Sequence, residues 1–271
     1  MKDEEDREDV WLTGRVHAPG GVISLTPQSR ALWAKTGGGE ERNLWSSLYV
    51  HMLDSMYVAR NLWGEWLSGS VKSDISSFIG SESAAEALVS WLACIHDIGK
   101  ATPAFQYKVL ERAEFVEEMG LRLPSACMMN HPPSHATMGE LIIEKWLDGR
   151  GWAFSWMFGS VVGAHHGASP SEDMLEDTKI ASGNFPIENL GDQEWESIQN
   201  ELLAWSFEIS GVYEFENLFQ VSAPPQSTQV LISALVIMSD WIASNSDFFP
   251  LIPCVENYAD SSARAETAWS S

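Results

Sequence analysis

Histidine and aspartate residues occur in this sequence as an ordered series of short motifs that could bind metal ions. In chain order the series comprises His51, His96 with Asp97, His135, His165 with His166, and Asp240. Neutral imidazoles and carboxylates together form a nitrogen and oxygen ligand set suited to Mn, Fe, Co, Ni or Zn. Cysteine is absent from the series, which argues against a closed structural zinc site. The chemistry predicted by the series is metal-assisted hydrolysis, in which bound ions activate water.

Asp240 is the most informative member of the series. It lies near the end of residues 227–243, a segment that is apolar almost all round and is predicted to be a buried helix. A carboxylate in such a place is unfavourable unless it is paired with a cation or bound to a metal. The chain offers few cations, and none at all between Ile180 and Ala263. A metal ion is therefore the simplest partner for Asp240.

Each motif also has a simpler explanation when it is taken alone. A single histidine on an apolar helix is usually a hydrogen-bonded core residue, and a His-Asp pair arises by chance in many proteins. Asp240 alone could bond to the backbone at a helix end. The prediction of a metal centre depends on the whole ordered set, with its members on separate helices.

The elements that position these residues are predicted to be mainly helices, from apolar residues that recur near a 3.6-residue period. The predicted helices cover residues 44–67, 82–96, 101–119, 134–147, 152–164, 193–209 and 227–243. Residues 11–43 are rich in Gly and Pro and are predicted to form loop or short turns, and residues 123–133 and 167–192 are predicted loops. We expect a mainly α fold, a compact helical bundle with long loops. Residues 1–10 are predicted to be a disordered acidic tail and residues 11–271 a single domain.

Composition and charge narrow the function. Hydrophobic residues make up 45% of the chain, which includes 13 Trp and 11 Phe, so a globular core is expected. The net charge of −22 argues against a surface that coats nucleic acid. Twelve acidic residues fall within 180–263. They are expected to form either a solvated surface or a docking face for a basic partner. Lys100, Lys108 and Arg112 are the cations near the motifs, so any nucleic acid is expected to bind on their side.

Location is predicted from the termini and the cysteines. The N-terminal residues MKDEEDREDV have no apolar stretch typical of a signal peptide. The longest apolar run without charge, about residues 151–164, is too short to span a bilayer. Cys94, Cys127 and Cys254 are far apart and odd in number, as expected of reduced thiols. A cytoplasmic protein with no membrane partner is expected.

The order of the motifs, with HDIGK around Asp97, resembles the HD superfamily of metal-dependent phosphohydrolases. The sequence is most similar to the HD nuclease domain of the CRISPR-associated helicase–nuclease of type I systems, with subtype I-E as the best match. The resemblance covers about residues 23–268. It is carried by Leu32 to Lys35 with Leu48, His51 and Asp54; His96 to Gln106; His135 to Gly139; and Ser239 to Ser244.

The resemblance implies two divalent metal ions, with Mn, Fe, Co or Ni favoured over Mg or Zn. One ion would be held by His51, His96, Asp97 and Asp240. The other would be held by His135, His165 and His166 together with a bridging oxygen of Asp97. His131, four residues before His135, is an alternative ligand, although its proline-rich loop would fix it less firmly.

The resemblance also implies roles around the ions. Asp97 and Lys100 would be the catalytic residues, and Lys100 would contact a substrate phosphate, with Lys108 as a further substrate-binding residue. Asp54 lies one turn after His51 and is expected to orient an imidazole without binding metal itself. His17 lies outside every motif and is expected at the surface.

The function implied is cleavage of single-stranded DNA by two-metal hydrolysis, as the nuclease part of CRISPR interference. The implied partners are single-stranded DNA, a helicase domain or subunit, and a CRISPR RNA-guided surveillance complex. The family normally carries a helicase after this domain, and no helicase motif occurs in these residues, so an excised domain or a natural split subunit is expected. Two alternatives stay open: an HD-type cyclic-dinucleotide or nucleotide phosphohydrolase, although no Gly-Tyr-Pro signature is present, and a binding module without catalysis.

Overall fold

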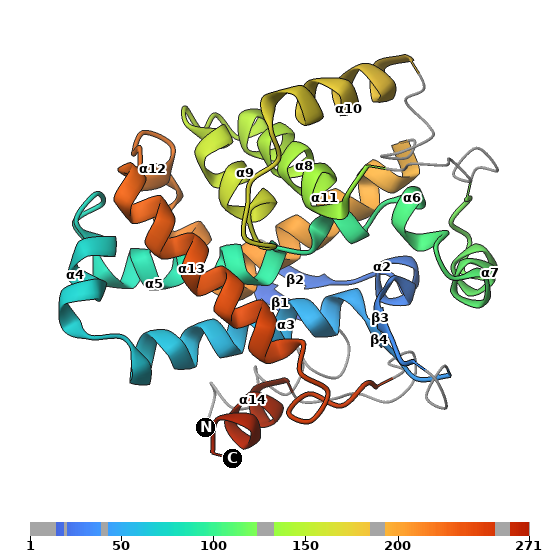
Figure 1. The fold of residues 1–271 in the computed structure, drawn as a ribbon, viewed down its shortest axis with the longest axis horizontal. Coiled ribbons are helices and arrows are strands. Elements are labelled where there is room, and N and C mark those ends of the chain that lie inside the picture. The colour runs from blue at the N-terminus through green and yellow to red at the C-terminus, as the bar shows by residue number, and fades with distance from the viewer. Residues whose placement is uncertain are drawn as a thin grey trace.

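The computed structural model describes residues 15–18, 21–38, 43–123, 133–184, 193–252 and 261–270, and these residues are mainly helical, as predicted (Figure 1). The predicted acidic tail, His131, Cys127 and Cys254 lie outside the described residues. Cys94 is buried and has a free thiol. None of the described helices is both long enough and apolar enough to cross a bilayer.

Two short antiparallel hairpins supply the strands of the described residues. In the first, β1 (Arg15–Ala18) pairs with β2 (Gly21–Ser24), and in the second, β3 (Trp33–Thr36) pairs with β4 (Trp45–Ser47). The α-helices are α2 (Pro27–Ala31), α3 (Leu48–Asn61), α4 (Gly69–Ser76), α5 (Glu82–Ile95), α6 (Pro103–Gln106), α7 (Leu110–Glu118), α8 (His135–Gly149), α9 (Ser155–Gly163), α10 (Glu172–Asn184), α11 (Gln193–Ser210), α12 (Glu216–Phe219), α13 (Gln226–Ala243) and α14 (Ser261–Trp269). Shorter turns are the π-helical η2 (Leu62–Trp66) and the 3₁₀ turns η3 (Ile98–Lys100) and η5 (Val212–Phe215).

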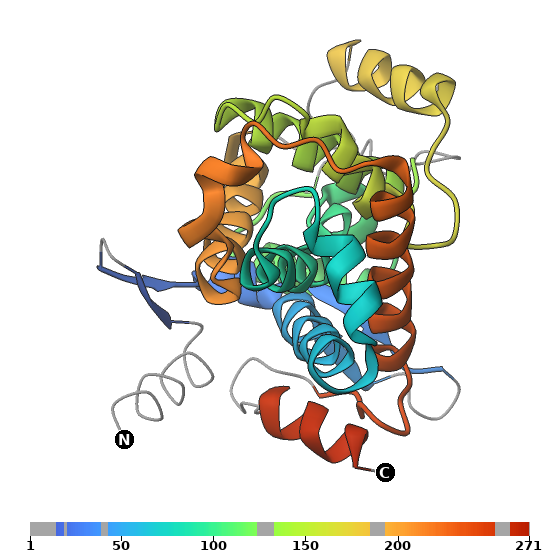
Figure 2. The ribbon, with the colours of Figure 1, turned by 90° about the vertical axis from the view of Figure 1, so that its left-hand side faces the viewer.

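The core forms around α3 and α5, which lie side by side at the centre of the molecule. Figure 2 shows both nearly end-on, with α13 on one side and α11 on the other. Ser81 caps α5 by accepting a hydrogen bond from the Ala84 backbone N–H. Trp91, in the middle of α5, is fully buried against Phe207 of α11. Burial of large apolar side chains on all sides of these two helices holds the motifs at their ends in fixed positions.

The region 11–43 was expected to be loop or short turns, and this expectation is wrong. It contains both strands of the first hairpin, α2 and β3. The predicted helix 44–67 likewise begins with β4 and ends in the π turn η2, and the predicted helix 101–119 is divided into α6 and α7. Strands of three or four residues contain too few positions to show the alternation by which a strand is recognised in a sequence.

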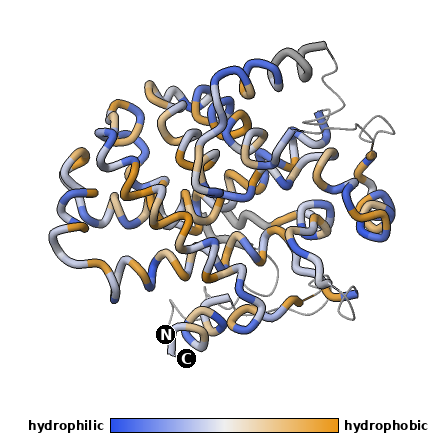
Figure 3. Tube along the Cα trace, viewed as in Figure 1, coloured by the Kyte–Doolittle hydropathy of each residue, from blue (hydrophilic) through white to orange (hydrophobic). Residues whose placement is uncertain are grey.

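The predicted polar loop 167–192 contains α10, which is a further correction. Most residues in the first turns of α10 are exposed, and Figure 3 shows them mainly in hydrophilic colours. A helix that buries little against its neighbours needs no apolar stripe, so its sequence lacks the periodic pattern.

Several carboxylates in the acidic stretch 180–263 serve the fold. Glu196 pairs with Lys145 at 2.9 Å, and Glu216 forms two hydrogen bonds with the Arg150 guanidinium. Glu201 accepts a hydrogen bond from the backbone N–H of Thr26 at 2.6 Å. These contacts connect α11 and α12 to other elements, and a docking role for the stretch stays a prediction.

Candidate metal centre

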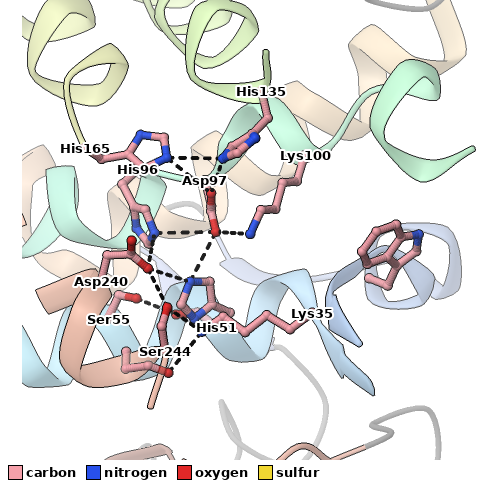
Figure 4. Close-up of polar contacts among 12 residues, drawn as sticks. Lys35, His51, Ser55, His96, Asp97, Lys100, His135, His165, Asp240 and Ser244 are labelled. Atoms are coloured by element: carbon pink, nitrogen blue, oxygen red, sulfur yellow. Dashed lines mark hydrogen bonds and ion pairs between the residues drawn. The ribbon is translucent and has the colours of Figure 1, made fainter. Parts of the chain in front are cut away.

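The seven residues of the His/Asp series converge on one place, although they come from elements far apart in the chain. Figure 4 labels all of them except His166. His51 lies on α3, His96 and Asp97 follow α5, His135 begins α8, His165 and His166 follow α9, and Asp240 lies on α13. They form two groups, and within each group the candidate ligand atoms all lie within 4.8 Å of one another. The groups are His51, His96, Asp97 and Asp240, and His135, His165 and His166.

Asp97 stands between the two groups. Its Oδ2 atom lies 3.1 Å from His51 Nε2 and 3.4 Å from His96 Nε2. Its Oδ1 atom lies 3.4 Å from His135 Nε2 and 3.6 Å from His165 Nε2. One carboxylate thus presents a different oxygen to each group, an arrangement that suits a ligand shared by both groups.

Asp240 completes the first group from α13. Its Oδ1 atom lies 3.5 Å from His51 Nε2 and 3.3 Å from His96 Nε2. The residue is 9% exposed and shares its side of α13 with the buried Val236 and Ala243. Trp241 and Val230 are exposed, so α13 is not buried all round as the sequence predicted. The second group is closed by His135, whose Nε2 atom lies 3.3 Å from that of His165 and 2.9 Å from that of His166.

Backbone carbonyls set the tautomer of two of the imidazoles. His96 Nδ1 lies 2.7 Å from the Ala93 carbonyl oxygen, and His165 Nδ1 lies 2.6 Å from that of Val162. A carbonyl oxygen only accepts hydrogen bonds, so each Nδ1 carries a proton, and in the neutral imidazole each Nε2 has a free lone pair. These Nε2 atoms are the ones that face the Asp97 carboxylate.

In the first group, the Nε2 atom of the neutral His96 imidazole directs a lone pair at carboxylate oxygens. The Nε2 atoms of His51 and His96 are buried and have no hydrogen-bond partner among the described residues. An ionised carboxylate has no proton to donate, so each of these contacts requires either a proton on the imidazole or a metal ion between the two atoms. A divalent metal ion fits this donor set, since neutral imidazole and carboxylate are ligands of transition metals.

The electrostatics agree with that donor set. Burial lowers the pKa of His51 to about 4, of His135 to about 3 and of His165 to about 4. These three imidazoles are therefore neutral at pH 7, as metal ligands must be. Burial also lowers the pKa of His96, but Asp97 and Asp240 outweigh it and raise that pKa to about 10. Without a metal, a proton on His96 would supply the positive charge that the two carboxylates require.

The motif around Asp97 is held by hydrogen bonds to its own backbone. Thr102 Oγ1 donates to the Gly99 carbonyl at 2.8 Å. The Gln106 side-chain amide donates to the carbonyls of Lys100 and Trp33, each at 2.9 Å. Gln106 is fully buried, so these bonds form in the absence of competing water. Gln106 thus links η3 to β3, and these hydrogen bonds restrict the backbone that follows Asp97.

Lys100 and Lys108 lie on the same side of the centre. Lys100 Nζ lies 2.5 Å from Asp97 Oδ2, and the residue is 9% exposed. Lys108 is exposed, and its Nζ atom lies 4.7 Å above the Phe105 ring, which is 5.6 Å from the His135 ring. The ammonium of Lys100 stabilises Asp97, and that of Lys108 stands over an aromatic ring that contacts the second group.

Asp54 does not have the partner expected for it, and this is a correction. Its Oδ2 atom accepts a hydrogen bond from Arg264 Nη2 of α14 at 3.1 Å, rather than bonding to an imidazole. Asp54 is 3% exposed, and α14 packs on the face of α3 that carries it. The partner is separated from Asp54 by 210 positions, so the local spacing to His51 contained no sign of it.

The remaining expectations differ in their outcome. His135 lies in the second group, whereas its alternative, His131, is outside the described residues. His17 lies in β1, and its predicted surface position stays a prediction.

Sequence reasoning assigned no role to Lys35 or Ser244, although both lie in segments that carried the resemblance. Lys35 Nζ lies 2.7 Å from Ser244 Oγ, beside the first group.

Comparisons with known proteins agree on one family. The family "Cas3, HD domain" matches residues 33–249. A CRISPR-associated nuclease/helicase Cas3 of Streptococcus thermophilus is 32% identical over 259 residues, which is 88% of this chain and 27% of that relative. An endonuclease/helicase Cas3 of Thermus thermophilus is 27% identical over 230 residues, which is 84% of this chain and 23% of that relative. The chain thus spans about a quarter of the length of these curated relatives.

A solved structure agrees in fold. The Thermus thermophilus Cas3 HD domain, solved in the presence of Ni²⁺, aligns with a TM-score of 0.64 at 21% identity and covers 90% of this chain and 89% of that one. This similarity supports an HD-domain helical fold.

Proposed function

The chain belongs to the Cas3 HD domain family, and from this premise we propose that it is a metal-dependent nuclease that hydrolyses DNA in CRISPR defence. The observation that carries the proposal is the position of Asp97, whose two carboxylate oxygens face separate groups of imidazoles at 3.1 to 3.6 Å. A site built in this way suits hydrolysis of a phosphodiester, which bears negative charge and needs an activated water.

We propose that the centre holds two divalent ions. His51, His96, Asp97 and Asp240 would hold one of them. His135, His165 and His166 would hold the other, with Asp97 shared between the two. Bound at such a site, divalent ions supply a water nucleophile at neutral pH and neutralise charge on the phosphate. The imidazole-rich donor set favours Mn, Fe, Co or Ni over Mg, which prefers oxygen ligands.

The chain's own residues prepare the site for this chemistry. The carbonyls of Ala93 and Val162 keep His96 and His165 in the tautomer that presents Nε2 to the centre. Lys100 holds Asp97 by its ammonium group, and its other N–H bonds are available to a substrate phosphate. In this proposal Asp97 and Lys100 are the catalytic residues, and no side-chain nucleophile takes part.

Single-stranded DNA is the proposed substrate. His96, Asp97 and His165 are each at most 2% exposed, and we propose that a phosphate reaches the centre through a recess. A flexible single strand can bend into a recess that the stiff backbone of a duplex enters less easily. Lys108 and Arg112 lie over the rings of Phe105 and Trp45. Neither forms an ion pair with a carboxylate within the part of the chain that the structure describes, so both are available to phosphates.

Replacing Lys108 with alanine is expected to weaken binding of single-stranded DNA and to reduce its dependence on salt. Loss of one phosphate contact lowers the slope of log affinity against log salt concentration by about one unit or slightly less. The measurement is fluorescence anisotropy with a labelled oligonucleotide at several salt concentrations. Lys145→Ala is the matched control, because Lys145 is paired with Glu196 and lies about 15 Å along α8 from His135. An unchanged slope in Lys108→Ala would show that Lys108 does not contact the strand.

Membership of this family also indicates which binding partners to propose. We propose a helicase domain or subunit and a CRISPR RNA-guided surveillance complex as partners, and a cytoplasmic location. Subtype I-E and the single-domain organisation stay predictions.

The proposed function is tested by metal analysis of the purified chain together with digestion of circular single-stranded DNA. We expect bound divalent ions, loss of the circle when Mn²⁺ is supplied, and no cutting after chelation. Loss of a circle also requires endonuclease action. Hydrolysis of a cyclic dinucleotide without cutting of the circle would favour the alternative, an HD-type phosphohydrolase of small nucleotides. A chain that binds no metal and cuts no DNA would support a binding module.

A further inference from the structure

A chain of hydrogen bonds connects Lys35 on β3 to the candidate ligand Asp240 on α13 (Figure 4). Lys35 Nζ lies 2.7 Å from Ser244 Oγ, and Ser244 Oγ lies 2.7 Å from Asp240 Oδ1. Lys35 Nζ also donates to the Ala243 carbonyl oxygen at 3.1 Å. A strand residue thereby joins the end of a helix 208 positions later, directly beside the candidate metal centre.

The donor and the acceptor of each hydrogen bond in this chain can be assigned. An ammonium group is a donor only, so Ser244 Oγ accepts from Lys35. An ionised carboxylate is an acceptor only, so the Ser244 hydroxyl proton is directed to Asp240 Oδ1. The same Oδ1 atom faces His51 Nε2 at 3.5 Å and His96 Nε2 at 3.3 Å. The bonds therefore fix the oxygen that faces the imidazoles.

The Lys35 ammonium group also lies at the C-terminal end of α13, where a positive charge is favourable. The last carbonyls of α13 have no partners within the helix, and the negative end of the helix dipole lies there. Burial, with the positive charge of Lys100 in second place, lowers the pKa of Lys35 to about 8 against the opposing effect of Asp97 and Asp240. The amine is therefore mainly protonated at neutral pH and keeps all three of its N–H donors.

We propose that Lys35, acting through Ser244, is a positioning residue that holds Asp240 in the orientation needed to bind a metal ion with His51, His96 and Asp97. This inference rests on the proposed function. Partners outside the ligand shell that orient a ligand typically change metal affinity by about 10- to 100-fold when they are removed. The effect should be confined to the first group, because among the described residues neither Lys35 nor Ser244 forms a hydrogen bond with a ligand of the second group.

The test compares four variants with the wild-type chain. Lys35→Met removes the ammonium group and keeps an unbranched stem, whereas Lys35→Arg keeps a cationic donor. Ser244→Ala removes only the hydroxyl, at an exposed position. Lys72→Met is the control, since Lys72 on α4 also donates to a backbone carbonyl, that of Gly64 at 3.4 Å. Binding of Mn²⁺ is measured by equilibrium dialysis with elemental analysis, and stability by thermal melting of the metal-free protein.

We expect two Mn²⁺ ions per wild-type chain. In Lys35→Met and Ser244→Ala, one of them should bind about 10- to 100-fold more weakly, with the other unchanged. Lys35→Arg should restore part of the affinity, and Lys72→Met should match the wild type. Unchanged affinities in both Lys35→Met and Ser244→Ala would overturn the inference and leave the proposed function intact. Equal weakening of both ions, or a loss that follows a lowered melting temperature of the metal-free protein, would also overturn it. A wild-type chain that binds no Mn²⁺ would overturn the metal centre and this inference together.

Discussion

Replacing Asp97 with alanine is expected to abolish metal-dependent cutting of circular single-stranded DNA and to remove bound metal from both groups. Asp97 is the one residue of the series that faces both groups, with Oδ2 near His51 and His96 and Oδ1 near His135 and His165. Loss of a shared ligand should exceed the roughly 10- to 100-fold effect of losing an outer partner. The cutting rate should therefore fall by more than about 100-fold.

The Asp97→Ala substitution should also change the electrostatics of the metal-free site. Burial raises the pKa of Asp97, but Lys100 and His96 outweigh burial and hold that pKa well below its usual value. Without this carboxylate, Lys100 loses its partner at 2.5 Å and His96 loses one of the two carboxylates that raise its pKa.

The measurements are the metal content and the cutting rate at saturating Mn²⁺. Asp74→Ala on α4 is the matched control, since Asp74 is exposed and lies outside both groups. Asp97→Asn removes the negative charge and keeps the shape of the side chain, so it should lose activity as Asp97→Ala does. Full metal content and normal cutting in Asp97→Ala would refute the bridging arrangement.

Replacing Gly99 with alanine is expected to disrupt the centre without changing a ligand. A Cβ atom at this position would lie 1.8 Å from the His135 carbonyl oxygen and 2.6 Å from the Gly139 backbone nitrogen. Both contacts are with backbone, so the turn η3 and the start of α8 must move apart. The contact with His135 requires a shift of about an ångström or more, and a displacement of that size at a reactive centre can lower a rate about 100-fold.

The shift should also lower stability. Overpacking of a tight contact typically costs about 1–3 kcal/mol. For a chain of this size, each kcal/mol corresponds to roughly 2–4 °C in melting temperature. Gly99 lies on the turn that follows Asp97 and contacts the backbone of His135. The distance between the two groups should therefore change as well, and we expect weaker metal binding.

Gly149→Ala is the matched control for this experiment. Gly149 lies on α8, the helix that Gly99 contacts, and a Cβ atom there would meet nothing within 4 Å. Thermal melting, metal content and the cutting rate should match the wild type in Gly149→Ala and fall in Gly99→Ala. Wild-type metal content and cutting in Gly99→Ala would show that the close approach of η3 to α8 is not needed for the centre.

The sequence by itself predicted most of the long helices and the donor types of the candidate site. Helices such as α5 and α13 bury long apolar faces, and that burial requires a periodic pattern that can be seen in one dimension. The donor types were equally visible, because imidazole and carboxylate have the same coordination chemistry in any fold. The HDIGK segment and the order of the histidines were sufficient to predict the family.

Only the tertiary structure decided which atoms meet. The division of the Asp97 oxygens between two groups, the pairing of Asp54 with Arg264 and the bonds from Lys35 through Ser244 to Asp240 all join distant parts of the chain. Periodicity describes only neighbours within a helical turn or along a strand. Contacts across about 200 positions depend on how whole helices pack, and no local pattern of residues contains that information. The short strands and α10 were missed for a related reason, since elements that are short or bury little leave almost no pattern in the sequence.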